Sequence, residues 1–307
     1  MSKTISTDLQ WPIEVANQTH SRTHAWHHRG SNYCLDFHGD PAAAELVIYS
    51  DGNHHMALEA CCQKFLDENQ QLTDIFYATT PPGVLLNALS SGGLLMGNMN
   101  ITVTPDIFIS PENIMQQLQN QEFIQSYQGF AKSVGNILLV KKGNPKKIHG
   151  IKDLLNPDIR LFISSHDKET ASYQVYANSI RKLASAHAID STAIEQLLSP
   201  DSDTTVFGQA IHHREVPQAL FEDRADVAMV YYHLGLRYTR IFPEHFDLVP
   251  LDISSVDDEG NELNLTTVYN IGVVNSGRDW GQKFFDFMLS DTAQALYKKH
   301  GLTTAKT

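Results

Sequence analysis

From about residue 45 onward, short apolar segments alternate with longer segments whose apolar residues recur every three or four positions. An apolar run of about four to eight residues is typical of a buried strand, and the longer period is typical of an amphipathic helix. The first such pair is "AELVIYS" (44–50) followed by "HHMALEACCQKFLDEN" (54–69). The second is "TDIFYATT" (73–80) followed by "PPGVLLNALSSG" (81–92), which has proline near its first turn and glycine past its end.

The same alternation continues to the C-terminus. Further strands are predicted at 106–111, 136–143, 159–165, 225–232, 246–253 and 269–277, and further helices at 111–119, 169–187, 213–224 and 279–301. Strands that are separated by helices usually pair in parallel and are covered by helices. The pattern therefore predicts an α/β fold of mixed, mostly parallel sheets with helices on both faces.

Residues 1–44 differ from the rest of the chain because they are polar and show no clear period. Some local structure is expected around "NYCLDFHGD" (32–40). This N-terminal His-rich extension contains His20, His24, His27, His28 and His38. A tract of this kind either binds metal or forms a polar surface segment without a ligand, and the sequence leaves both interpretations open.

The composition indicates a folded, acidic protein. The 307 residues are 42% hydrophobic and 19% charged, which allows a sizeable core and argues against global disorder. The net charge of −12 argues against a nucleic-acid-binding surface, which usually carries a basic patch. An anion ligand is compatible with this charge, because backbone amides act locally.

The cysteines and the apolar segments indicate in which cellular compartment the protein works. Cys34, Cys61 and Cys62 give no disulfide framework and indicate free thiols in a reducing compartment. Residues 1–24 contain no apolar core of a signal peptide, and no apolar run approaches the roughly 18 residues of a membrane span. As written, the sequence predicts a cytoplasmic protein without membrane insertion.

Small or polar residues occupy four of the places where a predicted strand passes into a helix. These junctions are Ser50-Asp51-Gly52-Asn53, Ala78-Thr79-Thr80-Pro81-Pro82-Gly83, Glu169-Thr170-Ala171-Ser172-Tyr173 and His212-His213-Arg214. In open α/β sheets, ligands bind outside the carboxyl ends of the strands, where helix N-termini offer unpaired N–H groups and partial positive charge. Helix capping by residues such as Asn53 and Thr80 explains any one junction, whereas four in one chain favour a shared anion ligand.

The sequence contains none of the common catalytic motifs. A nucleophile elbow, a Walker loop, a dinucleotide-binding glycine motif after a strand and an H-E-x-x-H motif are all absent. Cys61 and Cys62 lie two turns into the first predicted helix, where packing in the core is expected rather than nucleophilic attack. The prediction is a binding protein that is not an enzyme and that needs no cofactor.

Two pairs of adjacent histidines, His54-His55 and His212-His213, lie at the first and fourth junctions. Neighbouring side chains point in different directions, so neither pair chelates an ion alone. A zinc site would need one histidine from each pair, such as His55 with His213, and further ligands. The other interpretations are a ring N–H that donates to an oxyanion, or a wall residue without a ligand. Arg214 adds a permanent donor at the fourth junction.

The order of the blocks resembles one known family. Residues 46 to about 304 are similar to molybdate/tungstate-binding proteins, ABC-transporter substrate-binding proteins of the type II periplasmic binding-protein fold. The matching blocks are "VIYSDGNHHMALEACCQKF", "FYATTPPGVLLNAL", "TPDIFISPENIM", "NILLVKKGNP", "RLFISSHDKETASYQVYANSI", "FEDRADVAMVYY" and "FFDFMLSDTAQALYKKHGL". Their order carries the resemblance, and the closing tyrosine followed by K-x-x-G is especially typical of solute-binding proteins.

The resemblance implies two lobes joined by two crossing strands, with the ligand in the cleft between them. Lobe one would comprise residues 45–136 and 275–307, and lobe two residues 137–274, with hinges near Asn136 and Asn275. The family holds a tetrahedral oxyanion through hydroxyls and backbone N–H groups. The residues implied are Ser50, Asp51, Gly52, Asn53, Thr79, Thr80, Gly83, Thr170, Ser172, Tyr173, His213, Arg214 and Tyr231.

Two departures from the family pattern concern the ligand. Serine is usual at the first two sites, where this chain has Asn53 and Pro82-Gly83. His213 and Arg214 have no counterpart in the best-known members, and such donors favour another anion, a carboxylate-bearing ligand or a larger oxyanion.

Together these inferences predict a monomeric solute-binding protein that traps molybdate or tungstate by lobe closure, with an ABC-transporter permease as a partner. The alternative is a zinc-binding or zinc-sensing protein that uses His55 and His213. Family members work outside the cytoplasmic membrane. The resemblance therefore implies either a periplasmic protein whose export signal was removed or an intracellular relative.

Overall fold

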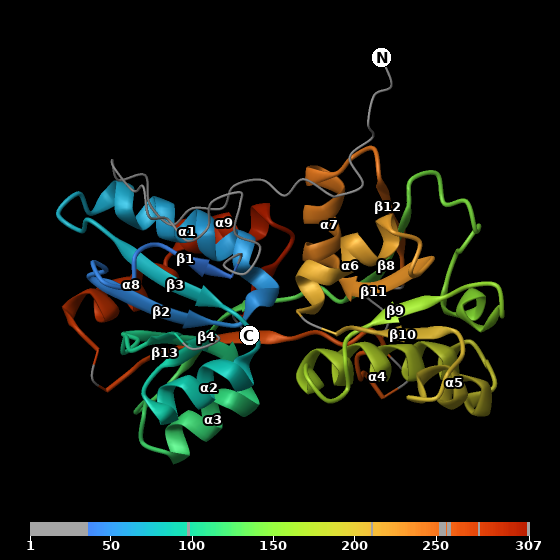
Figure 1. Ribbon diagram of the computed structural model, residues 1–307, viewed down its shortest axis with the longest axis horizontal. Helices are drawn as coiled ribbons and strands as arrows, with labels where there is room; N and C mark the ends of the chain where they lie inside the picture. The colour runs from blue at the N-terminus through green and yellow to red at the C-terminus, as the bar shows by residue number, and fades with distance from the viewer. Residues whose placement is uncertain are drawn as a thin grey trace. The chain divides into compact units, whose positions relative to one another are not determined.

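The computed structural model describes residues 36–96, 99–209, 211–251, 256, 259–275 and 277–305. The chain forms two compact units (Figure 1). We call lobe one the unit that holds the described residues up to Lys132 and those from Val268 onward, and lobe two the unit Ser133–Thr267. His20, His24, His27, His28 and Cys34 lie outside the described residues. No helix in the described part of the chain has both the length and the apolar character that crossing a membrane requires.

Lobe one is built on a seven-stranded sheet. Its strand order is β1 (Phe37–His38), β3 (Ile75–Thr79), β2 (Leu46–Ser50), β6 (Ile107–Pro111), β13 (Val268–Val273), β7 (Gln128–Lys132) and β14 (Thr303–Thr304). β2 pairs in parallel with β3 and β6, and the other neighbouring strands are antiparallel. A hairpin of β4 (Leu94–Met96) and β5 (Met99–Ile101) lies outside this sheet.

Helices cover both faces of the lobe-one sheet (Figure 1). Leu46 and Ile48 of β2 pack in one core with α1 (His55–Glu68), α8 (Asp279–Met288) and α9 (Asp291–Lys299). Val47 and Tyr49 pack in a second core with α2 (Pro82–Ser91) and α3 (Glu112–Asn120). Successive strand residues point to opposite faces, so burial of both faces requires the unbroken apolar run seen in the sequence.

Lobe two is built on a five-stranded sheet. Its strand order is β10 (Thr205–Phe207), β9 (Leu161–Ile163), β11 (Val227–Tyr231), β8 (Asn136–Lys141) and β12 (Phe246–Pro250). In Figure 1, α6 (His212–Phe221) and α7 (Tyr232–Ile241) lie on one side of this sheet, and α4 (Thr170–Ala186) and α5 (Ser191–Leu198) lie on the other. A 3₁₀ helix, η3 (Ile151–Leu155), precedes β9.

The predicted α/β fold with mixed sheets and helices on both faces is confirmed, but parallel pairing is less extensive than expected. Within lobe two, β9 is parallel to β10 and β11, whereas β8 is antiparallel to β11 and β12. β8 and β13 enter their sheets close to the points where the chain passes between the lobes. No helix of the same lobe precedes them directly, so the helical crossover that makes neighbouring strands parallel is missing.

The end of the predicted N-terminal extension belongs to the lobe-one sheet. Phe37 and His38 form the edge strand β1, antiparallel to β3. The His38 ring is buried and stacks on Tyr77 with a centroid distance of 4.3 Å and an interplanar angle of 15°. Residues 37–38 form a strand because they pair with β3 and pack on Tyr77, although this segment has no regular pattern of apolar residues.

Candidate functional site

The first two junctions lie side by side in lobe one. β2 and β3 are parallel, and their last residues, Ser50 and Thr79, pair in register. The chain therefore leaves both strands at the same edge of the sheet. Ser50, Asp51, Asn53, Thr79 and Thr80 are all buried at this edge.

The first junction is a short 3₁₀ helix, η2 (Gly52–His54), after which α1 begins at His55. The Asp51 carboxylate caps this turn and accepts a hydrogen bond from the Asn53 N–H at 2.8 Å. The prediction that Asn53 is the N-cap residue is therefore wrong, because Asp51 precedes it and takes the role. A carboxylate at this helix start occupies one of the donors that an anion would use.

The second junction follows β3. Thr79 Oγ1 donates toward the Asp36 carboxylate at 3.3 Å and lies 3.3 Å from His38 Nε2. Pro81, not Thr80, is the N-cap residue of α2, so the predicted capping role of Thr80 is also wrong. Gly83 is exposed in the first turn of α2, and a Cβ at this position would meet no atom within 4 Å.

The first histidine pair points into lobe one. His54 Nδ1 lies 2.8 Å from the Tyr297 hydroxyl, and His54 Nε2 lies 3.2 Å from Ser50 Oγ. His55 Nδ1 donates to the Gly52 carbonyl at 2.8 Å. Both histidines are buried, and these hydrogen bonds hold the turn between β2 and α1 from within the lobe.

The third junction connects β9 to α4 in lobe two. Thr170 is exposed and donates its hydroxyl to the His166 carbonyl at 2.9 Å. The Tyr173 hydroxyl donates to the Leu198 carbonyl at the end of α5, at 3.2 Å. Both hydroxyls are thus used within lobe two, while Ser172 is buried in the first turn of α4.

The fourth junction is the start of α6, whose geometry depends on a proline. Pro217 has no N–H, so the His213 carbonyl four residues earlier lacks its helical donor. The Tyr238 hydroxyl of α7 donates to this carbonyl at 2.6 Å. The His212 N–H at the helix start donates to Glu169 Oε2 at 2.9 Å. The first turn of α6 is therefore fixed from two sides.

The second histidine pair is also buried, together with Arg214, which is 9% exposed. The His212 ring stacks on Phe162 with a centroid distance of 5.7 Å and contacts Tyr176 at 5.2 Å. Burial, with a smaller contribution from the neighbouring His213, lowers the pKa of His212 to about 3, so the His212 ring is neutral at pH 7.

Tyr231 ends β11 and is 2% exposed. Its hydroxyl lies 2.8 Å from Thr267 Oγ1, and its ring stacks on His233. Thr267 in turn accepts at its carbonyl from the Ser133 N–H at 2.9 Å and donates its own N–H to Ser133 Oγ at 2.8 Å. Tyr231 is thereby tied to the two points where the chain enters and leaves lobe two.

Three buried polar residues at these sheet edges were missed in the sequence. They are Ser110 in β6, Ser164 after β9 and Tyr176 in α4. Ser110 and Ser164 each follow an apolar run directly, in "DIFIS" and "LFIS". The same pattern, "VIYS", marks the first junction, so it could have identified both serines. Tyr176 gave no signal, because a tyrosine on the apolar face of a helix reads as a core residue.

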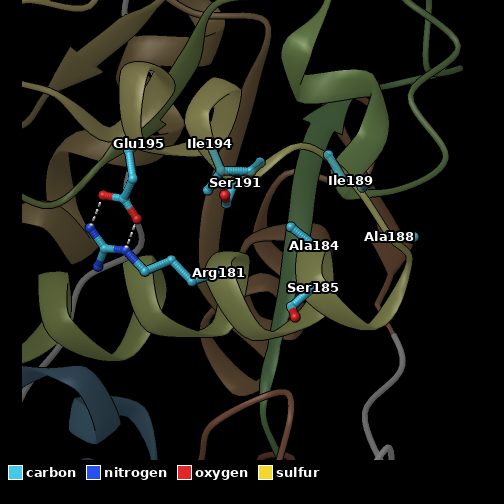
Figure 2. Close-up of a pocket in the computed structure, with 8 residues that line it drawn as sticks. All are labelled: Arg181, Ala184, Ser185, Ala188, Ile189, Ser191, Ile194 and Glu195. Atoms are coloured by element: carbon cyan, nitrogen blue, oxygen red, sulfur yellow. Dashed lines mark hydrogen bonds and ion pairs between the residues drawn. The ribbon is translucent and has the colours of Figure 1, made fainter.

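Two other features of the described residues bear on the site. A hollow of about 360 Å³ lies between α4 and α5, and Figure 2 shows the residues that line it. Its Arg181 and Glu195 form a two-point ion pair with distances of 2.7 and 2.9 Å, and none of the junction residues lines it. No group of three or more His, Cys, Asp or Glu side chains in the described part of the chain is arranged to hold a metal ion.

Comparison with known proteins identifies the family. A model of the bacterial extracellular solute-binding protein family matches residues 46–303. The chain belongs to this family. A search of curated proteins gave no match. The chain is thus a solute-binding protein, and the resemblance noted in the sequence is confirmed.

Solved structures of solute-binding proteins share the type II periplasmic binding-protein fold of this chain. The sulfate-binding protein SubI from Mycobacterium tuberculosis is 15% identical, with coverage of 85% of this chain and 87% of SubI and a TM-score of 0.64. L-phospholactate-bound PEB3, a Campylobacter jejuni protein, is 15% identical, with coverage of 84% and 99% and a TM-score of 0.60. The periplasmic molybdate-binding protein of Azotobacter vinelandii is 14% identical, with coverage of 85% and 100% and a TM-score of 0.58.

Proposed function

We propose that this solute-binding protein traps a small oxyanion in a cleft between its lobes and releases it when the lobes open. The observation that carries the proposal is the same in each lobe: parallel strands end in buried hydroxyls and helix starts at one edge of the sheet. In lobe one these are Ser50 to Asn53 and Thr79 to Gly83. In lobe two they are the buried Ser172 and Tyr231 hydroxyls and the helix starts at Thr170 to Tyr173 and around His213-Arg214.

Molybdate and tungstate are the first ligands to test. Proteins with this fold include two named for binding molybdate or sulfate and one solved with L-phospholactate. Each of these three ligands carries an oxyanion group. Helix N-termini and hydroxyls are suited to such groups, because they supply neutral donors in a site from which water is excluded. Arg214 adds one positive charge on the lobe-two side.

We further propose that the protein works as a monomer outside the cytoplasmic membrane and delivers its ligand to an ABC-transporter permease. The family is one of extracellular proteins, which favours the periplasm over the cytoplasm expected from the N-terminal residues. Its role is capture and delivery, so no chemical conversion of the ligand is expected. Lobe closure follows if the ligand contacts both lobes only in the closed state.

The test is a thermal-shift panel of molybdate, tungstate, sulfate, phosphate and zinc. A ligand at about 100 times its Kd stabilises a native protein by about 2.7 kcal/mol, which raises Tm by roughly 4 °C for a protein of this size. A rise with one or more oxyanions supports the proposal. No rise with any oxyanion at millimolar concentration contradicts it, and a rise with zinc alone supports the metal-binding alternative with His55 and His213.

A further inference from the structure

Polar groups that lack hydrogen-bond partners gather at one edge of lobe two. Ser164 and Tyr176 are 0% exposed and His212 is 1% exposed. Ser164 Oγ and both ring nitrogens of His212 have no hydrogen-bond partner among the described residues. The Tyr176 hydroxyl makes no hydrogen bond of good geometry there, although the Tyr231 backbone lies near enough to influence its pKa. We call these three residues the edge cluster.

The topology brings the edge cluster together. β9, β10 and β11 are parallel, so Ser164, which follows β9, and Tyr231, which ends β11, lie at the same sheet edge. The Tyr176 ring lies 5.1 Å from the Tyr231 ring and 5.2 Å from the His212 ring, measured between centroids. All three members of the cluster therefore belong to the carboxyl edge of the sheet.

The side of the sheet on which Ser164 lies follows from strand alternation. Phe162 and Ser164 are two residues apart, and the alternation of β9, continued one residue past its end at Ile163, puts them on the same face. The Phe162 ring stacks on His212 at 5.7 Å, so Ser164 lies on the His212 side, one step nearer the edge. The start of α6 closes this side, with its first N–H bound to Glu169.

Partner-free atoms in this position indicate a ligand. Buried polar atoms in native proteins are nearly always hydrogen-bonded, and each unmet one is costly. Three such atoms on Ser164 and His212, together with the Tyr176 hydroxyl beside His212, lie at the edge where this fold binds ligands, and they are explained together if ligand atoms complete their hydrogen bonds.

The chemistry of the cluster restricts the ligand. A neutral imidazole has one N–H donor and one acceptor nitrogen, and each hydroxyl both donates and accepts. A fully ionised oxyanion has only acceptors, so it leaves the acceptor nitrogen unsatisfied. The buried Glu169 carboxylate beside the His212 N–H adds negative charge that further disfavours such an anion.

We propose that Ser164, Tyr176 and His212 bind an oxyanion that carries at least one O–H group. Protonated phosphate and hydroxy acids share this chemistry, whereas sulfate, molybdate and tungstate at neutral pH lack it. The inference rests on the proposed function and ranks O–H-bearing ligands above molybdate and tungstate.

The experiment compares inorganic phosphate with sulfate by calorimetric titration of the full chain at pH 7 and constant ionic strength. The two ions have the same tetrahedral shape and differ in the O–H group. Phosphate is expected to bind at least about tenfold more tightly, since the cost of one unmet buried group corresponds to a factor of this order. A second arm compares glycerate with propionate, and it shows whether the O–H comes from the oxyanion or from a hydroxy acid.

Two variants test the cluster directly. Ser164→Ala removes one hydroxyl with little change in volume, and His212→Phe keeps the stack on Phe162 but removes both nitrogens. Each is expected to bring the preference for the O–H-bearing member of the pair to within about twofold. His245→Phe is the matched control, because His245 is exposed and packs on Phe221 away from the cluster. If His212→Phe fails to fold, Ser164→Ala decides the question.

The outcomes separate this inference from the proposed function. A preference that both cluster variants lose and His245→Phe keeps supports the inference. If an oxyanion binds but no O–H preference exists, or both cluster variants retain it, the inference is overturned and the proposed function stands. If no oxyanion binds to the unaltered chain, the proposed function and this inference fall together.

Discussion

The Tyr297 hydroxyl lies 2.8 Å from His54 Nδ1, which joins the last long helix of the chain to the first junction. His54 Nε2 continues the chain of hydrogen bonds to Ser50 Oγ, which donates to the Asp51 carbonyl. Because the Ser50 O–H donates to that carbonyl, Ser50 Oγ accepts from His54 Nε2–H, and His54 Nδ1 accepts from the Tyr297 hydroxyl. The closing tyrosine of α9 thus positions the turn at Gly52 and Asn53 through one buried imidazole.

Tyr297→Phe is expected to lower the free energy of unfolding by about 1–2 kcal/mol, because His54 Nδ1 is left without its donor. The measurement is urea unfolding at pH 7, combined with hydrogen exchange of the Gly52, Asn53 and His54 amides. These amides are expected to lose protection in the variant. Tyr49→Phe is the control: its hydroxyl donates to the Val103 carbonyl in the other core of lobe one, so similar exchange at the first junction in both variants contradicts the positioning role.

Tyr238→Phe is expected to lower the free energy of unfolding by about 1 kcal/mol, because the His213 carbonyl loses the hydrogen bond that the Tyr238 hydroxyl donates. Pro217→Ala restores a backbone N–H four residues after that carbonyl. The double variant Tyr238→Phe with Pro217→Ala is therefore expected to recover stability relative to Tyr238→Phe alone. Urea unfolding of the four proteins forms a double-mutant cycle, and strictly additive effects would refute the link between the two residues.

The stability of lobe two is expected to fall in mild acid because of His212. Burial lowers the pKa of His212 to about 3, whereas histidine in an unfolded chain has a pKa near about 6.5. Between these values only the unfolded chain takes up the proton, so the free energy of unfolding decreases as pH falls below about 6.5. Between pH 7 and pH 5 this residue contributes a loss of roughly 2 kcal/mol.

The measurement for His212 is urea unfolding at pH 7 and pH 5 for the unaltered chain and for His212→Phe. The difference between the two pH values is expected to shrink in the variant, and His245→Phe is expected to leave it unchanged. An equal pH dependence in His212→Phe and the unaltered chain would show that the ring is protonated within the fold.

The two adjacent cysteines of α1 are expected to be inert in the native protein. Burial raises the pKa of the Cys61 and Cys62 thiols, and both side chains are 0% exposed. Because the thiolate is the reactive form, a thiol reagent at pH 8 is expected to modify neither residue until the chain is unfolded in urea. The titration uses a Cys34→Ser background. Reaction of either thiol in the folded state would indicate that α1 opens locally.

The sequence predicted those strands and helices whose own pattern of buried residues is enough to identify them. All five residues of β2 are buried, so "LVIYS" carries a complete strand signal. β7, "QGFAK", has only two buried residues, and its pairing with β13 and β14 makes it a strand. In α7, a Cβ on Gly235 would lie 2.7 Å from the Ile137 side chain, so the close approach of this helix to β8 depends on tertiary packing that no local pattern reveals.

The site was predictable only to the level of which chain segments leave the strand ends. Asp51 and Asn53 are both good capping residues, and their competition is decided by the local turn rather than by residue type. The partner of His54 is 243 residues away in the sequence, so the histidine pair was visible but its role was not. In the sequence, His212 was only the neighbour of His213, a candidate ligand residue. Its burial against Phe162 in the structure shows that its ring nitrogens lie inside lobe two, at the carboxyl ends of the strands.

The hydrogen bond from Tyr238 to the His213 carbonyl has a consequence for folding order. α6 has 10 residues and a proline inside it, and isolated helices shorter than about 12–15 residues are marginal in water. Its first turn reaches its final geometry only when α7, which follows it in the chain, has packed and delivered the Tyr238 hydroxyl. A nascent chain that ends before Tyr238 therefore has the strands of lobe two up to β11 but not its finished fourth junction.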